Sequence, residues 1–148
     1  PIFGLDVIAG PKKITGFFHD FSRTIEPNHN MIEAFGYEVG KLEWRKEREL
    51  PEWAQAIFSP HMVAAGNVSK KEELDQLLEL SLDSVDSYLT DIGNYNYSAD
   101  TDEVRNAQNR YAHYQKQNPH TPRTMTSLGL AEQDVKVFVQ ECLFPDIA

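Results

Sequence analysis

The first 22 residues place the strongest constraint on the fold, because they have the pattern of two β-strands joined by a tight turn. Residues 2–9 and 14–21 are rich in β-branched and aromatic side chains, and residues 10–13 (Gly-Pro-Lys-Lys) are typical of a turn. These features predict a β-hairpin. Apolar residues occupy both alternating sets of positions along 2–9, which predicts a strand buried on both faces.

Three helices and one short strand are predicted after the hairpin. The clearest helix begins at Ser69, which has capping-box spacing to Glu72, and it ends at Gly93-Asn94. The others run from about 100 to 117 and from about 131 to 144, and the short strand lies within 60–65. Apolar residues recur at helical intervals along the first helix: Leu74, Leu77, Leu78, Leu82, Val85, Leu89 and Ile92.

The order of these elements, with strands early and helices late, indicates an α+β fold in which helices pack on an antiparallel sheet. A chain of 148 residues suits a single domain, 1–148. The chain begins with Pro1 and enters strand-like sequence at once, whereas a domain rarely opens inside a strand that has no upstream partner. We therefore expect that an N-terminal part is missing.

The composition excludes several classes of protein. With 14 Lys and Arg against 23 Asp and Glu, the formal net charge is −9, which argues against a nucleic-acid partner. No apolar run approaches the roughly 20 residues that span a bilayer, and no secretory leader is visible. The single cysteine, Cys142, excludes an internal disulfide and is expected in the core of the last helix. We expect a cytoplasmic monomer.

Asp6 is the first candidate for chemistry. In a strand buried on both faces, its carboxyl group would be kept out of water and would retain its proton near neutral pH. Such a group donates protons in general-acid catalysis. The alternatives are a structural aspartate bonded to a backbone N–H group and an aspartate exposed at a sheet edge.

The second candidate is the segment 111–123, in which a helix end, two prolines and many side-chain donors come together. It suits an anionic or polar ligand held by Asn118, His120, Thr121 and Arg123, and the alternative is a solvated loop. The histidines have no recognisable zinc spacing, so a metal site is not expected. Because His19 and Asp20 are adjacent in a strand, one of them must face inward.

The order and spacing of several motifs resemble the ferredoxin-dependent bilin reductases, and the resemblance covers nearly the whole chain. It rests on PIFGLDVIAGP at 1–11, DFS at 20–22, RELPEW at 48–53, IFS at 57–59 and GNV at 66–68. The run 111–123 and LFPDI at 143–147 also match. The resemblance implies an α/β/α sandwich, with the bilin held between an antiparallel sheet and C-terminal helices.

The resemblance also implies the activity, which is reduction of biliverdin IXα to a phycobilin by single-electron, proton-coupled steps. Electrons come from an external reduced [2Fe–2S] ferredoxin, and the protein binds no metal or flavin of its own. Asp6 matches the catalytic aspartate of the family, which protonates the bound bilin. Asn118 matches a pocket asparagine, and His120 and Thr121 fall where the family places polar contacts to the substrate.

Two departures from the family pattern leave alternatives open. The usual histidine partner of the aspartate would lie upstream of Pro1, and Pro119 stands where many relatives have an acidic residue. The product is therefore open between phycocyanobilin and phycoerythrobilin, the second of which is made by a marine-phage branch of the family. The function alternatives are a linear-tetrapyrrole-binding protein without catalysis, a protein similar to red chlorophyll catabolite reductase, and an inert fragment.

A ferredoxin partner raises an electrostatic question, because ferredoxins are acidic and this chain is acidic as well. Docking would need a local basic patch. The candidates are Lys12, Lys13, Arg45, Lys46 and Arg48, and the alternative for this charge run is an ordinary solvated surface.

Overall fold

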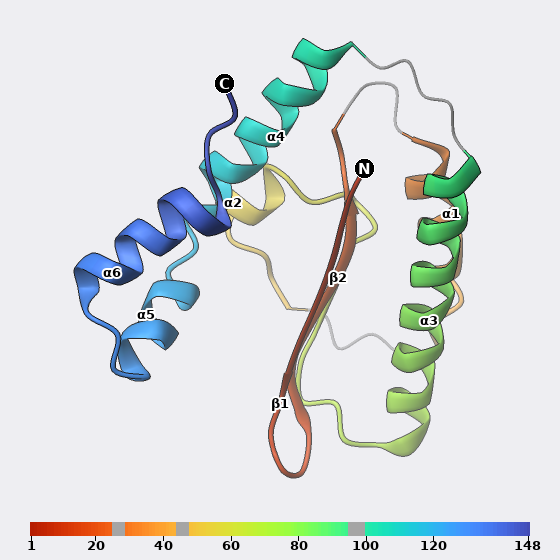
Figure 1. Cartoon of the computed structure of the whole chain (residues 1–148). Coiled ribbons are helices and arrows are strands. Elements are labelled where there is room, and N and C mark those ends of the chain that lie inside the picture. The colour runs from red at the N-terminus through yellow and green to blue at the C-terminus, as the bar shows by residue number, and fades with distance from the viewer. Residues whose placement is uncertain (25–28, 44–47, 95–99) are drawn as a thin grey trace. The chain divides into compact units, whose positions relative to one another are not determined.

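The computed structural model describes residues 1–24, 29–43, 48–94 and 100–148 (Figure 1). The chain divides into two compact units, and we describe each by itself. The first consists of Pro1–Leu50 and Phe58–Ser98, and the second of Pro51–Ile57 and Ala99–Ala148. Among the helices described, none combines the length and the apolar character needed to cross a membrane.

The first unit contains an antiparallel sheet with strand order β1-β2-β3. Strand β1 (Ile2–Ala9) pairs with β2 (Ile14–Ser22), and β2 pairs in turn with β3 (Val63–Ala65). The backbone N–H of Gly10 donates to the carbonyl oxygen of Lys13 at 2.9 Å and closes the turn. The predicted hairpin, the short strand and the α+β class with an antiparallel sheet are confirmed.

Strand alternation gives this sheet two chemically different faces. The helix-covered face carries Phe3, Leu5 and Val7 of β1 opposite Phe21, His19 and Phe17 of β2. The Asp6 face carries Gly4, Asp6 and Ile8 of β1 opposite Asp20, Phe18 and Gly16 of β2. Of the candidate residues in these two strands, His19 lies on the helix-covered face, and Asp6 and Asp20 lie on the Asp6 face.

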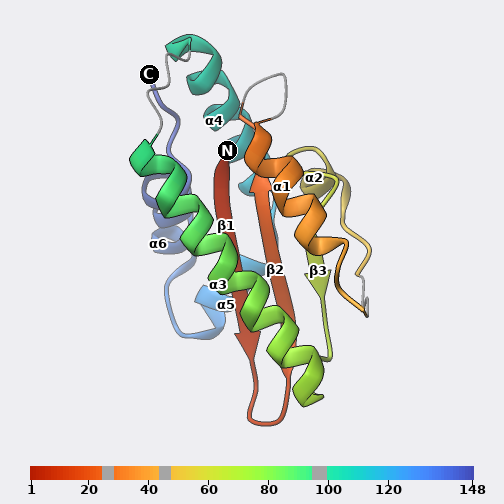
Figure 2. The same cartoon turned by 90° about the vertical axis from the view of Figure 1, so that its right-hand side faces the viewer.

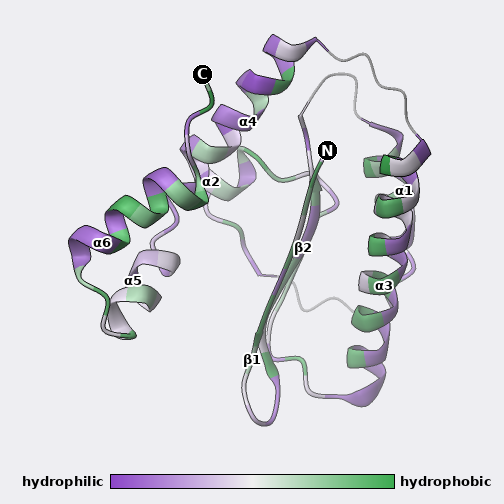
Figure 3. Ribbon diagram, viewed as in Figure 1, coloured by the Kyte–Doolittle hydropathy of each residue, from purple (hydrophilic) through white to green (hydrophobic). Residues whose placement is uncertain are grey.

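Helices α1 (Asn30–Val39) and α3 (Lys71–Asn94) lie on one side of the sheet (Figures 1 and 2). Both turn apolar surface toward the strands, as the hydropathy colouring in Figure 3 shows. The hydrophobic core lies between these helices and the sheet, and it includes Phe17, Phe21, Ile32, Phe35 and Leu77. A cap fixes the start of α1, where Nδ1 of His29 accepts a hydrogen bond from the backbone N–H of Met31 at 3.1 Å.

The predicted apolar stripe of α3 is only partly buried, which corrects the sequence analysis. Leu77 is buried and Leu74 half-buried, and the buried line continues through Leu80 and Ser84. The other residues of the stripe lie between about a quarter and about half a turn around the helix from this line. They are exposed: Leu78, Leu82, Val85, Leu89 and Ile92. The helix also begins at Lys71 and not at Ser69.

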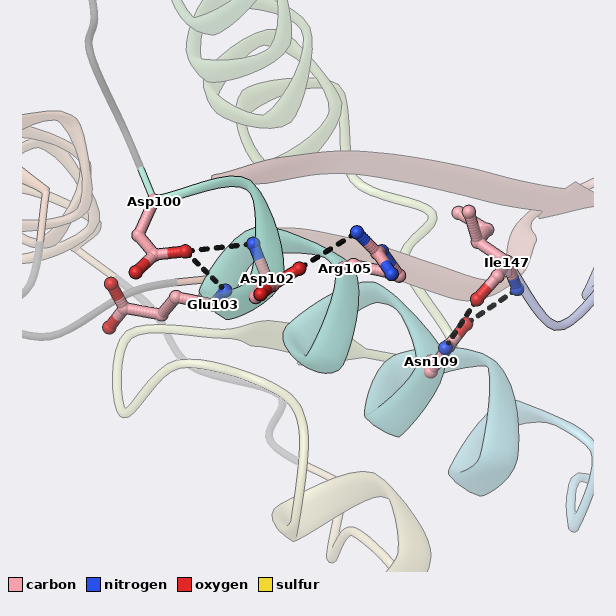
Figure 4. Close-up of polar contacts among 6 residues, drawn as sticks. All are labelled: Asp100, Asp102, Glu103, Arg105, Asn109 and Ile147. Atoms are coloured by element: carbon pink, nitrogen blue, oxygen red, sulfur yellow. Dashed lines mark hydrogen bonds and ion pairs between the residues drawn. The ribbon is translucent and has the colours of Figure 1, made fainter.

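The second unit is helical in its described residues. It contains α2 (Glu52–Gln55), α4 (Thr101–Gln115), α5 (His120–Ser127) and α6 (Glu132–Val137), and α6 continues into a π-helix (Phe138–Leu143). The predicted helix from about 100 is confirmed as α4, and Asp100 caps it, because its carboxylate accepts hydrogen bonds from the N–H groups of Asp102 and Glu103 (Figure 4).

The C-terminal tail is fastened to α4 by one asparagine side chain. Asn109 donates from Nδ2 to the carbonyl oxygen of Ile147 at 2.9 Å and accepts from its backbone N–H at 2.8 Å (Figure 4). Lys116 adds an ion pair with Asp146 at 2.8 Å. The LFPDI segment therefore includes a structural contact, because both Ile147 and Asp146 hold the tail on one helix.

Two sequence expectations fail in the second unit. Residues 120–127 form helix α5, which is not among the three predicted helices. Pro122 lies in the first turn of α5, where a backbone N–H has no partner inside a helix, so its missing donor costs nothing. Cys142 is exposed and does not lie in the core, where Val135 and Val139 of the same segment are buried.

Candidate functional site

Asp6 lies in the middle of β1, opposite Phe18 of β2, and its side chain is exposed. The prediction of a strand buried on both faces is therefore wrong for residues 5–9, all of which are exposed. Two features explain the difference: within the described residues β1 pairs with β2 alone, and Asp6 projects from the face opposite α1 and α3. Within the described residues, its carboxylate makes no hydrogen bond or ion pair.

A second carboxylate, Asp20, lies diagonally across from Asp6 on the same face, and its surroundings are entirely different. It is 2% exposed. Its Oδ1 accepts a hydrogen bond from the hydroxyl of Ser59 at 2.5 Å. Its Oδ2 accepts from the backbone N–H of Ser59 at 2.9 Å and from the hydroxyl of Ser22 at 2.8 Å. Asp20 therefore fastens the segment at Ser59 to the sheet, and Asp6 is the carboxylate left available for a ligand.

Arg48 and Phe18 complete the Asp6 face. The guanidinium carbon of Arg48 lies 5.7 Å from the centroid of the Phe18 ring, and Phe18 is the cross-strand partner of Asp6. The backbone N–H of Arg48 donates to the carbonyl oxygen of Ala64 at 2.9 Å, which anchors it to the backbone of β3. The Asp6 face thus presents an acid, the aromatic ring of its cross-strand partner and a cation over that ring.

His19 and Asp20 are both buried, on opposite faces of the sheet. One of them was expected to face inward, and the structure buries both. Nδ1 of His19 donates to the carbonyl oxygen of Gly4 at 2.8 Å, and the ring packs edge-on against Phe35. Burial lowers the pKa of His19, whereas its hydrogen bond to Gly4 and the charge of Asp20 act in the opposite direction and raise it. A neutral imidazole in this position stabilises the sheet behind the Asp6 face.

The other predicted ligand residues lie in the second unit: Asn118 just before α5, and His120 and Thr121 in its first turn. The carboxamide oxygen of Asn118 accepts a hydrogen bond from the backbone N–H of His120 at 2.9 Å and so helps to start α5. His120 is exposed and Thr121 is half-buried. The structure therefore brings these three residues together at the start of one helix.

The remaining candidates from the sequence are the basic residues of the predicted docking patch. Lys12 and Lys13 lie at the β1–β2 turn, where Lys13 donates to the Asn67 side chain at 2.6 Å, whereas Arg45 and Lys46 are outside the described residues. In the described part of the chain, no cluster of His, Cys, Asp and Glu suits a metal ion. Sequence reasoning missed the position of Arg48 over Phe18, because only the pairing of segments distant in sequence creates it.

Comparison with known proteins identifies the relatives of this chain. A family model described as ferredoxin-dependent bilin reductase matches residues 1–145. Two similar proteins are phycocyanobilin:ferredoxin oxidoreductases from two strains of Prochlorococcus marinus. The one from strain MIT 9313 is 30% identical over 99% of this chain and 56% of its own length. The one from the second strain is 30% identical over 97% of this chain and 59% of its own length.

A solved structure, that of PcyX, gives the same result at the level of the fold. It is similar to this chain with a TM-score of 0.61 and 30% sequence identity, covering 100% of this chain and 59% of PcyX. The chain thus spans somewhat more than half the length of the relatives that it matches. Because the family model covers nearly every residue, this chain belongs to the ferredoxin-dependent bilin reductase family.

Proposed function

We propose that this chain serves in the ferredoxin-dependent reduction of biliverdin IXα to a phycobilin, with Asp6 as the proton donor. One observation carries the proposal: in a chain of this family, the carboxylate of Asp6 stands on a sheet face beside an aromatic ring, with no partner among the described residues. Both oxygens of the neighbouring Asp20 accept hydrogen bonds from serine groups, and Asp20 is buried, so it is not available to a ligand.

The chemistry divides between the substrate and the protein. A linear tetrapyrrole has an extended conjugated system that accepts single electrons, which reduced [2Fe–2S] ferredoxin supplies from outside. Each electron makes the bilin more basic, so every two-electron reduction also consumes two protons. Asp6 donates one of these protons from the sheet face, and a proton from solvent restores the acid before the next turnover.

Asn118, His120 and Thr121, all in the second unit, are proposed as further contacts to the substrate. Their amide, imidazole and hydroxyl groups are hydrogen-bond donors of the kind that bind lactam oxygens and carboxylates. All three occur in the segment 118–121 at the start of α5, so one ligand can meet them together. Their role is to orient the bilin, while the acid chemistry belongs to Asp6.

The decisive experiment is anaerobic turnover of biliverdin IXα by the chain with ferredoxin and a reducing system. We expect radical absorbance followed by a phycobilin, which chromatography identifies as phycocyanobilin or phycoerythrobilin. Asp6→Asn should bind biliverdin with unchanged affinity and lose at least about 100-fold in rate. The matched control is Asp86→Asn, which alters an exposed carboxylate of α3 on the other side of the sheet. Equal rates for both variants would remove Asp6 from its role.

A second function, binding of a linear tetrapyrrole without reduction, is favoured by the region around Asn118. Its carboxamide oxygen is already engaged by the backbone of His120, and the adjacent Pro119 has no acidic side chain. Tight binding of biliverdin without electron uptake from ferredoxin would select this function. Competition between biliverdin and a chlorophyll catabolite tests the similarity to red chlorophyll catabolite reductase.

A further inference from the structure

The β1–β2 turn and the start of α3 form a basic end of the first unit, although the formal net charge of the chain is −9. Residues 7–19 and 60–71 contain four lysines and no aspartate or glutamate. These lysines are Lys12, Lys13, Lys70 and Lys71. After Lys71, α3 carries seven acidic residues and no further Lys or Arg. Positive and negative charges are therefore separated within this unit.

Hydrogen bonds fasten the turn to the segment that leads into α3. Ile14 and Val68 exchange two backbone hydrogen bonds, at 2.9 and 3.0 Å, and Nζ of Lys13 donates to Oδ1 of Asn67 at 2.6 Å. Lys12 and Lys70 each lie two residues beyond the antiparallel bridge of Ile14 and Val68, past the same end of it. Figures 1 and 2 both show the turn and the start of α3 at one end of the sheet. The lysines are thus gathered by the fold.

Three of these lysines have no carboxylate to neutralise them. Lys12, Lys13 and Lys70 are exposed, and within the described residues none of them makes an ion pair. The partner of Lys13 is a neutral amide, which fixes the side chain without cancelling its charge. Lys71 differs, because it pairs with Asp75. The uncompensated positive charge is therefore that of the other three.

Exposed apolar side chains lie beside these lysines, at the end of β1. Val7 is 47% exposed and Ile8 is 52% exposed. An apolar centre with a charged rim is typical of a protein–protein interface, and electron-transfer complexes use small interfaces. Four residues of β1 separate Gly10 from Asp6, which is about 13 Å at the rise of a β-strand. A protein bound at this end is close to the proposed acid.

We propose that the lysine end, defined as Lys12, Lys13 and Lys70 around Val7 and Ile8, is the surface on which the acidic ferredoxin docks. This inference rests on the proposed function, in which ferredoxin supplies the electrons. The lysines attract an acidic protein, whereas the acidic residues of α3 repel it, so the approach of ferredoxin is oriented. The local charge thereby overcomes the repulsion that the net charge of the chain creates.

The electron count requires an interface that forms and separates quickly. In each docking event the reduced [2Fe–2S] cluster loses one electron and the bilin gains one. Every two-electron reduction therefore takes two docking events, and the oxidised ferredoxin leaves between them. A small interface steered by charge provides fast association without slow release.

The test follows turnover of biliverdin IXα at a series of ferredoxin concentrations. At low salt, Lys12→Glu and Lys70→Glu should each raise the KM for ferredoxin about threefold, and the double variant should raise it about tenfold. The kcat should stay that of the wild type, because charge reversal slows the encounter and not the chemistry. High ionic strength should remove most of the difference. The affinity for biliverdin, titrated by absorbance without ferredoxin, should not change.

Lys41→Glu is the matched control for the single reversals. It changes the net charge equally at an exposed lysine of the same unit. The charge of Lys41 interacts with that of Asp83, which lies about 18 Å along α3 from Lys71. This variant should leave the KM for ferredoxin unchanged. The conservative variants Lys12→Arg and Lys70→Arg keep the positive charge and should also retain the wild-type KM.

The possible failures are distinguishable. If the reversals leave the KM for ferredoxin and its salt dependence unchanged, or change them no more than Lys41→Glu does, the lysine end is an ordinary solvated surface and the docking inference is wrong, while the proposed function stands. Weaker binding of biliverdin with an unchanged KM for ferredoxin would overturn it as well. Circular dichroism checks folding, and Lys12→Gln and Lys70→Gln carry the comparison if the reversals unfold the chain.

Calorimetric titration of the chain with oxidised ferredoxin measures docking without turnover. Binding that weakens in Lys12→Glu and Lys70→Glu supports the lysine end even if the wild type does not reduce biliverdin, in which case the proposed function alone fails. Absence of binding in the wild type at low salt overturns the docking inference.

Discussion

The two faces of the sheet differ in how their polar groups are satisfied. On the helix-covered face, the ring of His19 is enclosed by Phe17, Phe21 and Phe35 and bonded to the backbone. On the Asp6 face, Asp20 is enclosed by serine donors, whereas Asp6 and Arg48 stand open. Burial and hydrogen bonding thus mark the residues that hold this unit together, whereas exposed charges without an ion pair among the described residues mark those available to a ligand.

The largest expected effect on stability is that of truncating the aromatic core. Phe21 is 1% exposed and meets the rings of Phe3 and Phe35 at 5.4 and 5.2 Å. Phe21→Ala should lower the free energy of unfolding by about 4 kcal/mol, measured by urea denaturation followed by circular dichroism. The matching change on the other face, Phe18→Ala, should cost clearly less because Phe18 is only half-buried. Equal losses would abolish the distinction between the faces.

The next effect concerns the buried carboxylate of the Asp6 face. Asp20→Ala leaves the two donors of Ser59 and the hydroxyl of Ser22 without their acceptor. Buried donors that lose a charged partner should cost about 3 kcal/mol in the free energy of unfolding, measured by the same denaturation. The double variant Asp20→Ala with Ser59→Ala should lose less than the sum of the single changes, because both remove one shared contact.

The fold was predictable from sequence where the signals are local. The hairpin has its own turn residues, and the start of α4 has its own cap in Asp100, so neither depends on distant parts of the chain. Helix α5 was missed because the effect of Pro122 depends on its position. A proline in the interior of a helix interrupts it, whereas a proline in the first turn, as here, does not.

The site was less predictable than the fold, because exposure depends on neighbours distant in sequence. The apolar pattern of residues 2–9 is that of a buried strand, yet within the described residues β1 pairs with β2 alone and Asp6 is exposed. Arg48 lies over Phe18 only because residues 16, 48 and 66 meet in three dimensions. Residue identity pointed to Asp6, but only the assembled sheet distinguishes the exposed Asp6 from the buried Asp20 and places Arg48 over Phe18, the cross-strand partner of Asp6.

A smaller effect, dependent on pH, should come from His19. Burial lowers its pKa from the ordinary value of 6.5, so the unfolded chain binds a proton first as the pH falls below 6.5. The contribution of the neutral ring to stability is complete above pH 6.5 and is lost toward lower pH, with a slope of at most about 1.4 kcal/mol per pH unit. His19→Phe should remove this slope, measured by urea denaturation at a series of pH values. Burial also lowers the pKa of His29, which remains in both proteins and cancels in the comparison.

The smallest effect on stability is expected at Asp6 itself, where the contrast between the faces is sharpest. An exposed carboxylate without a partner among the described residues contributes little to the folded state, so Asp6→Asn should change the free energy of unfolding by no more than about 0.5 kcal/mol. Urea denaturation of the variant beside the wild type measures it. A loss of several kcal/mol would show that Asp6 supports the sheet as Asp20 does, and the loss of turnover in Asp6→Asn would then report a damaged fold. With stability unchanged and turnover lost, the carboxylate acts in the chemistry alone.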